Sequence, residues 1–256
     1  MEVVLLCAGR GSRLGNMTDE KPKSMTEIHG IPIILNTIAI LQKLNIKNIK
    51  LILGYGYSKF PKLHGVESII NQNWNITNMV GSYILSVNKN SFHDTIFIYG
   101  DIIVNKEVLS NYIDTLDKKV GSIVIDDNWY DYWCARSSQP LDDVETCVVD
   151  KNDNLIELGK KIDKNKIPNF QYTGIGFFPL SYQKKIYKEW SSKLSLTSKG
   201  RNFYMTEMIN KLIKDHYQFV VHKICGQWLE IDTETDLNLA LKLSKKTNED
   251  ELLVLR

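Results

Sequence analysis

The sequence lacks the clustered ligands and the charge excess that mark two common functional classes. Its four cysteines, at positions 7, 134, 147 and 225, form no Cys-x-x-Cys pair, and its five histidines are equally scattered. Because a zinc site needs clustered ligands of this kind, we do not expect one. The formal net charge is only +2, whereas nucleic-acid binders concentrate basic residues. No nucleic-acid partner is therefore expected.

Long apolar runs and a leader segment are also absent. No stretch approaches the roughly 18 apolar residues that cross a bilayer. The chain passes from Met1-Glu2 directly into a short apolar run, without a basic region or a cleavage site. The widely spaced cysteines are then most simply small core residues in a reducing compartment. We expect a cytoplasmic protein without a membrane partner.

What the sequence does contain is a regular alternation of strands and helices. With 256 residues, 43% of them apolar, the chain fits one large domain with a sizeable core. Residues 3–8 form a continuous apolar run that ends at Gly9, residues 32–44 show helical spacing, and residues 48–53 again have strand character. This order predicts a right-handed βαβ unit at the start of the chain.

The alternation continues through the rest of the chain. Thr233 and Asp236 have the spacing of a capping box at the start of the last helix. The pattern predicts an α/β fold with a doubly wound, mixed but mostly parallel, Rossmann-like sheet and a small substrate-binding portion. Further helices are predicted at residues 78–88, 182–190, 204–214 and 232–246, and further strands at 66–70, 95–99, 121–125, 146–149, 174–178 and 219–223.

A glycine-rich loop directly follows the first predicted strand. Gly9 and Gly11 allow the backbone to approach a phosphate closely. A P-loop would end in Gly-Lys-Ser/Thr, which is absent, and in a dinucleotide loop the third glycine would come one residue before Gly15. A plain turn with solvated charges is the remaining alternative. A triphosphate is favoured because its charge calls for fixed cations, and four lie in or just after the loop: Arg10, Arg13, Lys21 and Lys23.

Gly9-x-Gly11-Ser12-Arg13-Leu14, followed by Lys21-Pro22-Lys23, resembles the signature of the nucleoside-diphosphate-sugar pyrophosphorylase superfamily. The resemblance implies a nucleotidyltransferase with the fold of that family, in which the loop amides wrap the triphosphate. It also implies that Arg13 contacts the β- and γ-phosphates and that Lys23 neutralises charge on the α-phosphate. Cys7 stands where the family usually has alanine. The nucleotide-binding residues expected on this basis are Leu6, Ala8, Gly9, Arg10, Gly11 and Ser12.

Two aspartates are candidates to bind a metal ion. Asp101 follows a predicted strand, and Asp232 lies far away in the sequence. In a doubly wound sheet both can reach the loop after the first strand, and two carboxylates suit Mg²⁺. The resemblance supports the pairing, because family members carry Gly-Asp and Glu-Ile-Asp-Thr-x-x-Asp-Leu at corresponding places. The alternative is that Asp232 only caps the last helix and Asp101 only lies in a turn.

No histidine or serine constellation for a general-base mechanism is evident. None is needed if the nucleophile is a phosphate monoester, which is mostly a dianion at neutral pH because its second pKa is about 6. Catalysis then consists of aligning two anions and neutralising their charge, with Mg²⁺, Arg13 and Lys23. Relatives often carry a further lysine near the phosphates, which makes Lys160 a third catalytic candidate. An exposed turn is the alternative for that segment.

Residues 71–82 indicate one branch of the superfamily. They resemble the Asn-x-x-Tyr-x-x-Thr-Asn-x-x-x-Ser pattern of the phosphocholine-cytidylyltransferase-like branch, with Trp74 in place of the tyrosine. The resemblance implies that Asn78 and Ser82 lie near the cytosine and the ribose of CTP. A helix N-terminus with polar caps is the alternative. Gln171 stands where the branch often has glutamate, which removes a charge from the expected acceptor site.

The acceptor itself is left open by the sequence. The resemblance is weakest between residues 110 and 160. Within that stretch, the aromatic segment 129–133 can hold a cationic head group, or Arg136 can bind a carboxylate of an amino-acid-like acceptor. A subunit contact is the third interpretation.

The resemblance as a whole implies a magnesium-dependent cytidylyltransferase that uses CTP and a small phosphorylated acceptor, of phosphoglutamine or phosphocholine type, for capsule or surface polysaccharide modification. A hexose-1-phosphate nucleotidyltransferase using UTP, dTTP or GTP is the alternative, ahead of an inactive nucleotide sensor and a dehydrogenase. We expect one domain over residues 1–256, with 1–110 mainly nucleotide-binding, 111–227 mainly acceptor-binding, and 228–256 holding the metal motif and the terminal helix. The oligomeric state stays open, a homodimer included.

Overall fold

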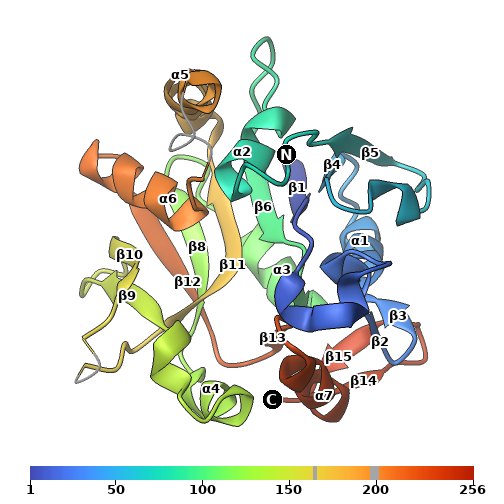
Figure 1. Cartoon of the computed structure of the whole chain (residues 1–256). Helices are drawn as coiled ribbons and strands as arrows, with labels where there is room; N and C mark the ends of the chain where they lie inside the picture. The colour runs from blue at the N-terminus through green and yellow to red at the C-terminus, as the bar shows by residue number, and fades with distance from the viewer. Residues whose placement is uncertain (164–165, 197–201) are drawn as a thin grey trace.

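A seven-stranded sheet forms the centre of the computed structural model, which describes residues 1–163, 166–196 and 202–256 (Figure 1). Its strand order is β12-β8-β11-β6-β1-β4-β5. Neighbouring strands are parallel except where β11 pairs antiparallel with β6 and β8. The predicted doubly wound, mostly parallel sheet is thus confirmed. The strands are β1 (Glu2–Cys7), β4 (Ile49–Leu53), β5 (Val66–Ile70), β6 (Thr95–Tyr99), β8 (Gly121–Asp126), β11 (Gln171–Phe178) and β12 (Phe219–Ile224).

Strand β1 shows why the sheet has a core on each face. Its side chains alternate, so that Val3 and Leu5 enter one core while Val4 and Leu6 enter the other. Helices α1 (Ile33–Lys43), α3 (Lys106–Asp114), α4 (Tyr130–Arg136) and α7 (Glu234–Leu243) contribute to the first core. Helices α2 (Met79–Ser86), α5 (Leu180–Leu196) and α6 (Met205–Lys214) contribute to the second. Among the described residues, no helix combines the length and the apolar character that crossing a membrane requires.

Four small antiparallel sheets complete the fold. The pairing of β7 (Ile102–Val104) with β13 (Trp228–Glu230) joins the segment after β6 to the C-terminal part of the chain. It therefore decides which residues meet at the carboxyl edge of the central sheet. The other pairs are β2 (Glu27–Ile28) with β3 (Ile31–Pro32), β9 (Glu145–Val149) with β10 (Leu155–Lys161), and β14 (Ser244–Lys246) with β15 (Leu252–Val254).

The structure differs from the sequence prediction mainly in short elements. Helices α3 and α4 were not predicted. The last helix, expected over residues 232–246, begins at Glu234 and ends at Leu243, because Ser244 is extended and starts β14. The predicted capping box of Thr233 and Asp236 is present. Most other predicted elements agree with the observed ones to within a few residues.

The loops after β1 and β6 lie side by side. Leu6 is in register with Tyr99, and the Gly100 amide donates to the Leu6 carbonyl over 3.0 Å. After β1 the chain forms two 3-10 turns, η1 (Ser12–Thr18) and η2 (Lys23–Met25). The glycine-rich loop and the end of β6 consequently border the same edge of the sheet, where parallel α/β folds bind their ligands.

Candidate active site

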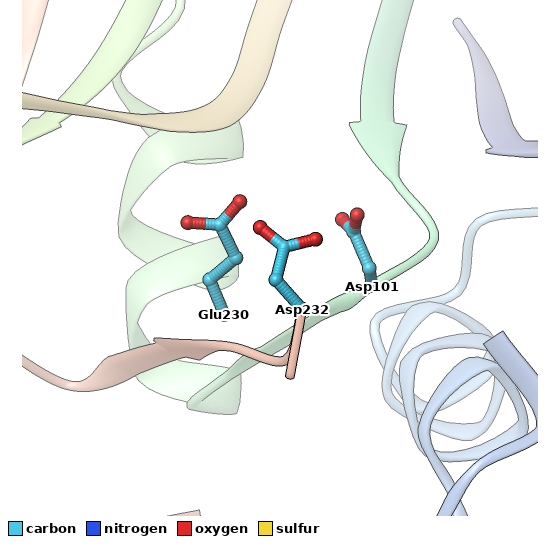
Figure 2. A group of neighbouring side chains, drawn as sticks. All are labelled: Asp101, Glu230 and Asp232. Carbon is cyan, nitrogen blue, oxygen red and sulfur yellow. The ribbon is translucent and has the colours of Figure 1, made fainter. Parts of the chain in front are cut away.

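Three acidic side chains meet at this edge of the sheet. Asp101 follows β6, Glu230 ends β13, and Asp232 comes two residues later. The pairing of β7 with β13 brings the segments together, because Glu230 lies opposite Ile102 and the Ile231 amide donates to the Asp101 carbonyl over 3.0 Å. One oxygen from each carboxylate lies within 4.8 Å of the other two. Figure 2 shows all three carboxylates pointing toward the same space.

The chemistry of this cluster fits a divalent cation. Carboxylate oxygens are the hard ligands that Mg²⁺ prefers. The Oδ1 atom of Asp101 is buried and has no hydrogen-bond partner among the described residues, although buried acceptors are ordinarily paired. Burial and the nearby Asp232 carboxylate raise the pKa of Glu230 to about 8. A bound cation would relieve this crowding of like charges, so the three residues suit a magnesium ion.

Two basic side chains reach the carboxylates from the N-terminal turns. Lys23 begins η2, with 12% of its side chain exposed, and its Nζ donates to Asp101 Oδ2 over 2.7 Å and also to Asp232 Oδ1. Arg13 Nη2 pairs with Asp232 Oδ1 over 3.0 Å, while most of the Arg13 side chain is exposed. Burial alone would lower the pKa of Lys23, but the two aspartates outweigh it and raise that pKa. The ammonium is therefore charged at neutral pH.

The backbone conformation at two glycines permits this close approach. Gly11 has φ 76°, which L side chains rarely adopt, and a Cβ there would lie 2.4 Å from the Cβ of Lys23. A Cβ on Gly100 would lie 2.4 Å from the Sγ of Cys7 and 2.8 Å from the carbonyl oxygen of Leu6. Only glycine lets the loop fold over Lys23 and lets the end of β6 pack directly against the end of β1.

Two cavities meet at the carboxylates. The smaller, of 330 Å³, follows the glycine-rich loop, and the larger, of 590 Å³, extends toward β9 and β11. An arrangement of this kind can hold two ligands that touch over the acidic cluster. The residues that line both cavities are Arg13, Met79, Tyr99, Glu230 and Asp232.

The predicted nucleotide-binding residues divide into two groups. Leu6, Gly9, Gly11 and Asn78 line the smaller cavity, and Ala8, Arg10, Ser12 and Ser82 are not among its lining residues. Arg10 pairs with Asp19 over 2.5 Å. Ser82 is buried in α2 and accepts a hydrogen bond from Asn71 Nδ2 over 3.1 Å, while Asn78 caps the same helix. For all eight residues, contact with a nucleotide stays a prediction.

The structure does not bring the Lys160 side chain into either cavity. Its Nζ donates to Glu157 on the exposed side of β10, and its backbone amide donates to Thr146 Oγ1 over 3.1 Å. Gly159, with φ 74°, accompanies a shift in register of β10 against β9. The next residue, Lys161, lines the larger cavity instead. A catalytic role of Lys160 stays a prediction, and of the two neighbouring lysines it is Lys161 that lines a cavity.

Sequence reasoning gave no role in the acidic cluster to Glu230, which is part of it, or to Arg136, which pairs with it. Glu230 precedes Asp232 by two positions, and the two-residue period of an extended segment could have placed both side chains on one side. Arg136 ends α4, is 7% exposed, and donates through Nη1 to Glu230 Oε2 over 2.9 Å. Its partner is 94 positions away, so no local pattern indicated the contact.

The aromatic segment 129–133 lies mostly inside the protein. Trp129, Tyr132 and Trp133 are 2–3% exposed, and of these only Trp133 lines the larger cavity. Arg136 is paired with the chain's own carboxylates. Core packing and internal ion pairs already use most of these side chains, which argues against two of the alternatives that the sequence left open, an aromatic site for a cationic head group and an Arg136 that binds an acceptor carboxylate.

Known proteins share both the sequence and the fold of this chain. Residues 3–162 match the family model described as the MobA-like NTP transferase domain. The chain is 30% identical over 257 residues to the CTP:phosphoglutamine cytidylyltransferase of Campylobacter jejuni, in an alignment covering 94% of this chain and 100% of that protein. It is 28% identical over 233 residues to the bifunctional sugar-1-phosphate nucleotidylyltransferase/acetyltransferase of Sulfurisphaera tokodaii, covering 90% of this chain but only 52% of that protein. The structure of the CTP:phosphocholine cytidylyltransferase from Streptococcus pneumoniae has the same fold, with a TM-score of 0.72 at 20% identity over 94% of this chain and 97% of that one.

Proposed function

The chain belongs to the family of MobA-like NTP transferase domains and is a nucleotidyltransferase, and from this premise we propose that it is a magnesium-dependent cytidylyltransferase. In this proposal it transfers CMP from CTP to a small phosphorylated acceptor and releases pyrophosphate. The observation that carries the proposal is the meeting of three carboxylates with Lys23 and Arg13 between two adjoining cavities.

The smaller cavity is the proposed site of CTP. Its walls include Gly9 and Gly11, whose backbone can approach phosphates closely. Arg13 and Lys23 border the same cavity and supply the positive charge that a triphosphate requires. Asn78 lines the cavity at the start of α2, where its amide can meet the polar edge of a base.

The proposed reaction needs alignment and charge neutralisation more than proton transfer. An oxygen of the acceptor phosphate forms a bond to the α-phosphorus of CTP, and the bond from that phosphorus to pyrophosphate breaks. Mg²⁺, held by Asp101 and Asp232 with Glu230 beside them, would supply positive charge to the reacting phosphates. Lys23 and Arg13 would turn from the carboxylates to the phosphates and neutralise charge as the bond to pyrophosphate breaks. No side chain has to act as a general base, because the attacking phosphate is already a dianion.

The larger cavity is the proposed acceptor site, and we propose an acceptor of the phosphoglutamine type ahead of phosphocholine. The relative that aligns over its full length with this chain bears the name CTP:phosphoglutamine cytidylyltransferase. The cavity wall also suits a polar acceptor that carries N–H groups. Gln171 Oε1 is buried without a hydrogen-bond partner among the described residues, and Lys161 and Glu145 provide one charge of each sign.

A hexose-1-phosphate acceptor is the second candidate. It is favoured by the similarity to the sugar-1-phosphate nucleotidylyltransferase of Sulfurisphaera tokodaii over 90% of this chain. The walls of the larger cavity also include hydrogen-bonding side chains that suit sugar hydroxyl groups, among them Gln171, Thr173 and Thr206. The two candidates differ in both the nucleotide and the acceptor, so one matrix of reactions separates them.

The test is pyrophosphate release measured for CTP, UTP, dTTP and GTP against phosphoglutamine, phosphocholine and glucose 1-phosphate. We expect the highest turnover with CTP and phosphoglutamine. Turnover with UTP or dTTP and a hexose phosphate would instead support the second candidate.

Asp101→Asn should lower kcat by roughly 100- to 1000-fold while leaving the unfolding temperature close to that of the wild type. Asp114→Asn, an exposed carboxylate at the end of α3, is the control, and near-normal turnover of Asp101→Asn would refute the metal role.

We also propose the wider setting of the reaction. In it residues 1–110 mainly bind nucleotide, residues 111–227 mainly bind the acceptor, and residues 228–256 carry metal ligands. The enzyme would work in the cytoplasm, as a monomer or a homodimer. Its CDP-activated product suits transfer of a phosphoester group onto capsule or surface polysaccharide, because CMP is a good leaving group for that step. Mass spectrometry of the product tests whether the new bond is a pyrophosphate linkage to CMP.

A further inference from the structure

Behind the acidic cluster, one guanidinium group contacts several carboxylates at once. Arg136 donates through Nε to Asp236 Oδ1 over 2.8 Å and through Nη2 to Asp236 Oδ2 over 3.2 Å. Its Nη1 donates to Glu230 Oε2 over 2.9 Å, and Nη2 lies 3.7 Å from Asp232 Oδ2. The side chain is 7% exposed and stacks on Trp133, with 4.4 Å from its central carbon to the ring centroid. Both contacts hold the guanidinium plane in a fixed orientation.

Asp236 connects this guanidinium to the backbone of the segment after β13. Its Oδ2 atom accepts from the amides of Asp232 over 2.9 Å and of Thr233 over 2.8 Å. Asp236 is itself 2% exposed and belongs to the capping box at the start of α7. The carboxylate that Arg136 holds with two hydrogen bonds therefore also sets the backbone orientation of Asp232.

Helix α4 fixes the neighbouring Glu230 in the same way. The hydroxyl of Tyr132 accepts from the Glu230 amide over 3.0 Å and donates to the Glu230 carbonyl over 3.0 Å. Helices α4 and α7 contact each other, and in Figure 1 they lie on either side of the C-terminus. Two residues of α4 thus hold this segment: Tyr132 contacts the backbone of Glu230, and Arg136 contacts the side chains of Glu230 and Asp236.

We propose that Arg136 is a positioning residue for the metal site, which holds Glu230 and Asp232 in the arrangement that binds a divalent cation. The inference rests on the proposed function. Lys23 and Arg13 lie on the ligand side of the carboxylates, where substrates would draw them away. Arg136 lies among α4, β13 and α7, and its bonds to Asp236 keep it there. It is the cation that stays with the carboxylates throughout the reaction and keeps them from separating.

Arginine is required here because of its geometry as well as its charge. Three N–H groups of Arg136 donate in one plane to two different carboxylates. A lysine ammonium is a point charge on a flexible stem and cannot reproduce this fork. Arg136→Lys therefore keeps the charge and removes the orientation. Residues that orient metal ligands typically change metal affinity by about 10- to 100-fold when they are replaced.

The test is the affinity for Mn²⁺, measured by water-proton relaxation on the intact protein, with and without CTP. We expect Arg136→Lys to weaken Mn²⁺ binding by about 10- to 100-fold. In turnover assays, the Mg²⁺ concentration for half-maximal rate should rise, and kcat should partly recover at saturating Mg²⁺. Asp236→Asn keeps an acceptor for the two amides but loses its charge, and it should weaken Mn²⁺ binding in the same direction. This second variant carries the test if Arg136→Lys does not fold.

Arg256→Lys is the matched control. Arg256 is also an arginine with a 10% exposed side chain, pairs with the buried Asp126, and lies 4.3 Å from the Tyr132 ring centroid. We expect the Arg256→Lys variant to have a lower unfolding temperature and an unchanged affinity for Mn²⁺. If the folded Arg136→Lys and Asp236→Asn proteins bind Mn²⁺ as the wild type does, the positioning role is refuted. If the wild type itself binds no Mn²⁺ in either titration, the proposed metal site fails first.

Discussion

Lys23 occupies the space between two candidate metal ligands in the free protein. Its ammonium contacts carboxylate oxygens of Asp101 and Asp232. These two carboxylates are the groups that a divalent cation would use as ligands. The two carboxylates lie close together in a poorly hydrated place, where like charges are costly without a cation. Lys23 therefore stabilises the two carboxylates, and under the proposed function a metal ion bound there would free its ammonium to contact the phosphates.

Replacement of Lys23 should make the stability of the protein depend on metal. Lys23→Met removes the ammonium from Asp101 and Asp232, of which Asp232 still has Arg13 as a partner, and losing this buried contact costs roughly 1–3 kcal/mol. For a chain of this size, each kcal/mol corresponds to roughly 2–4 °C in the unfolding temperature. In EDTA we expect Lys23→Met to have a lower unfolding temperature than the wild type. On addition of Mg²⁺ its unfolding temperature should rise by more than that of the wild type, and thermal unfolding measures both effects.

Lys21 provides the matched control for this experiment. It lies two residues earlier and pairs with Glu27 over 2.9 Å, but its side chain is 57% exposed. Exposed ion pairs contribute roughly 0–1 kcal/mol, so Lys21→Met should behave like the wild type with and without Mg²⁺. A Lys23→Met protein whose response to Mg²⁺ equals that of Lys21→Met would contradict the competition between lysine and metal.

Single residues of the site were predictable where a short motif carries them. Asp101, Asp232, Lys23 and Arg13 follow from such motifs, and the structure brings all four together. Arg136 could not be found in this way, because its partners are 94 and 100 positions away. Lys160 was named because relatives often carry a lysine at this point, and the sequence did not predict β10, whose register places Lys161 instead of Lys160 at the larger cavity.

At the scale of elements, the site depends on how closely β6 approaches β1. Strands with nearly continuous apolar runs, such as β1 and β6, were predictable because burial on both faces requires that composition. The short strands β7 and β13 were not, since three residues carry no clear period. Yet this pair joins the segment after β6 to the metal motif. Gly100 stands between the two strands β6 and β7 and faces the end of β1.

Gly100→Ala should separate β6 from β1 and destabilise the fold. The added Cβ would lie 2.4 Å from Cys7 Sγ and 2.8 Å from the Leu6 carbonyl oxygen, and overpacking of this kind costs roughly 1–3 kcal/mol. Combining it with Cys7→Ala removes the sulfur contact, so thermal unfolding of the double variant should show a smaller loss than the sum of the single ones. Gly9→Ala, where a Cβ would meet nothing within 4 Å, is the control. Strict additivity of Gly100→Ala and Cys7→Ala would disprove the clash.

At the scale of the whole molecule, the site exists only when the two ends of the chain are joined. Lys23 and Arg13 come from the start, and Glu230 and Asp232 come from the last part of the sequence. The sequence indicated both segments but not what holds them together. Part of that connection is β15, which packs against β7. Asn105, the residue after β7, holds β15 by accepting from the Val254 amide over 2.7 Å and donating to the Val254 carbonyl over 3.1 Å.

Asn105→Leu should loosen the C-terminal strand and, with it, the pairing of β7 with β13. Leucine has a similar size but leaves two buried backbone groups of Val254 unpaired, at roughly 1–3 kcal/mol each. The two groups together cost roughly 2–6 kcal/mol, so the unfolding temperature should fall by roughly 4–24 °C, given roughly 2–4 °C per kcal/mol. The control is Asn111→Leu, which changes an exposed asparagine on α3. It should shift the unfolding temperature little. Hydrogen exchange should also show faster exchange of the β13 amides in Asn105→Leu alone. Equal unfolding temperatures for the two variants would mean that this asparagine does not tie the C-terminal strand to the site.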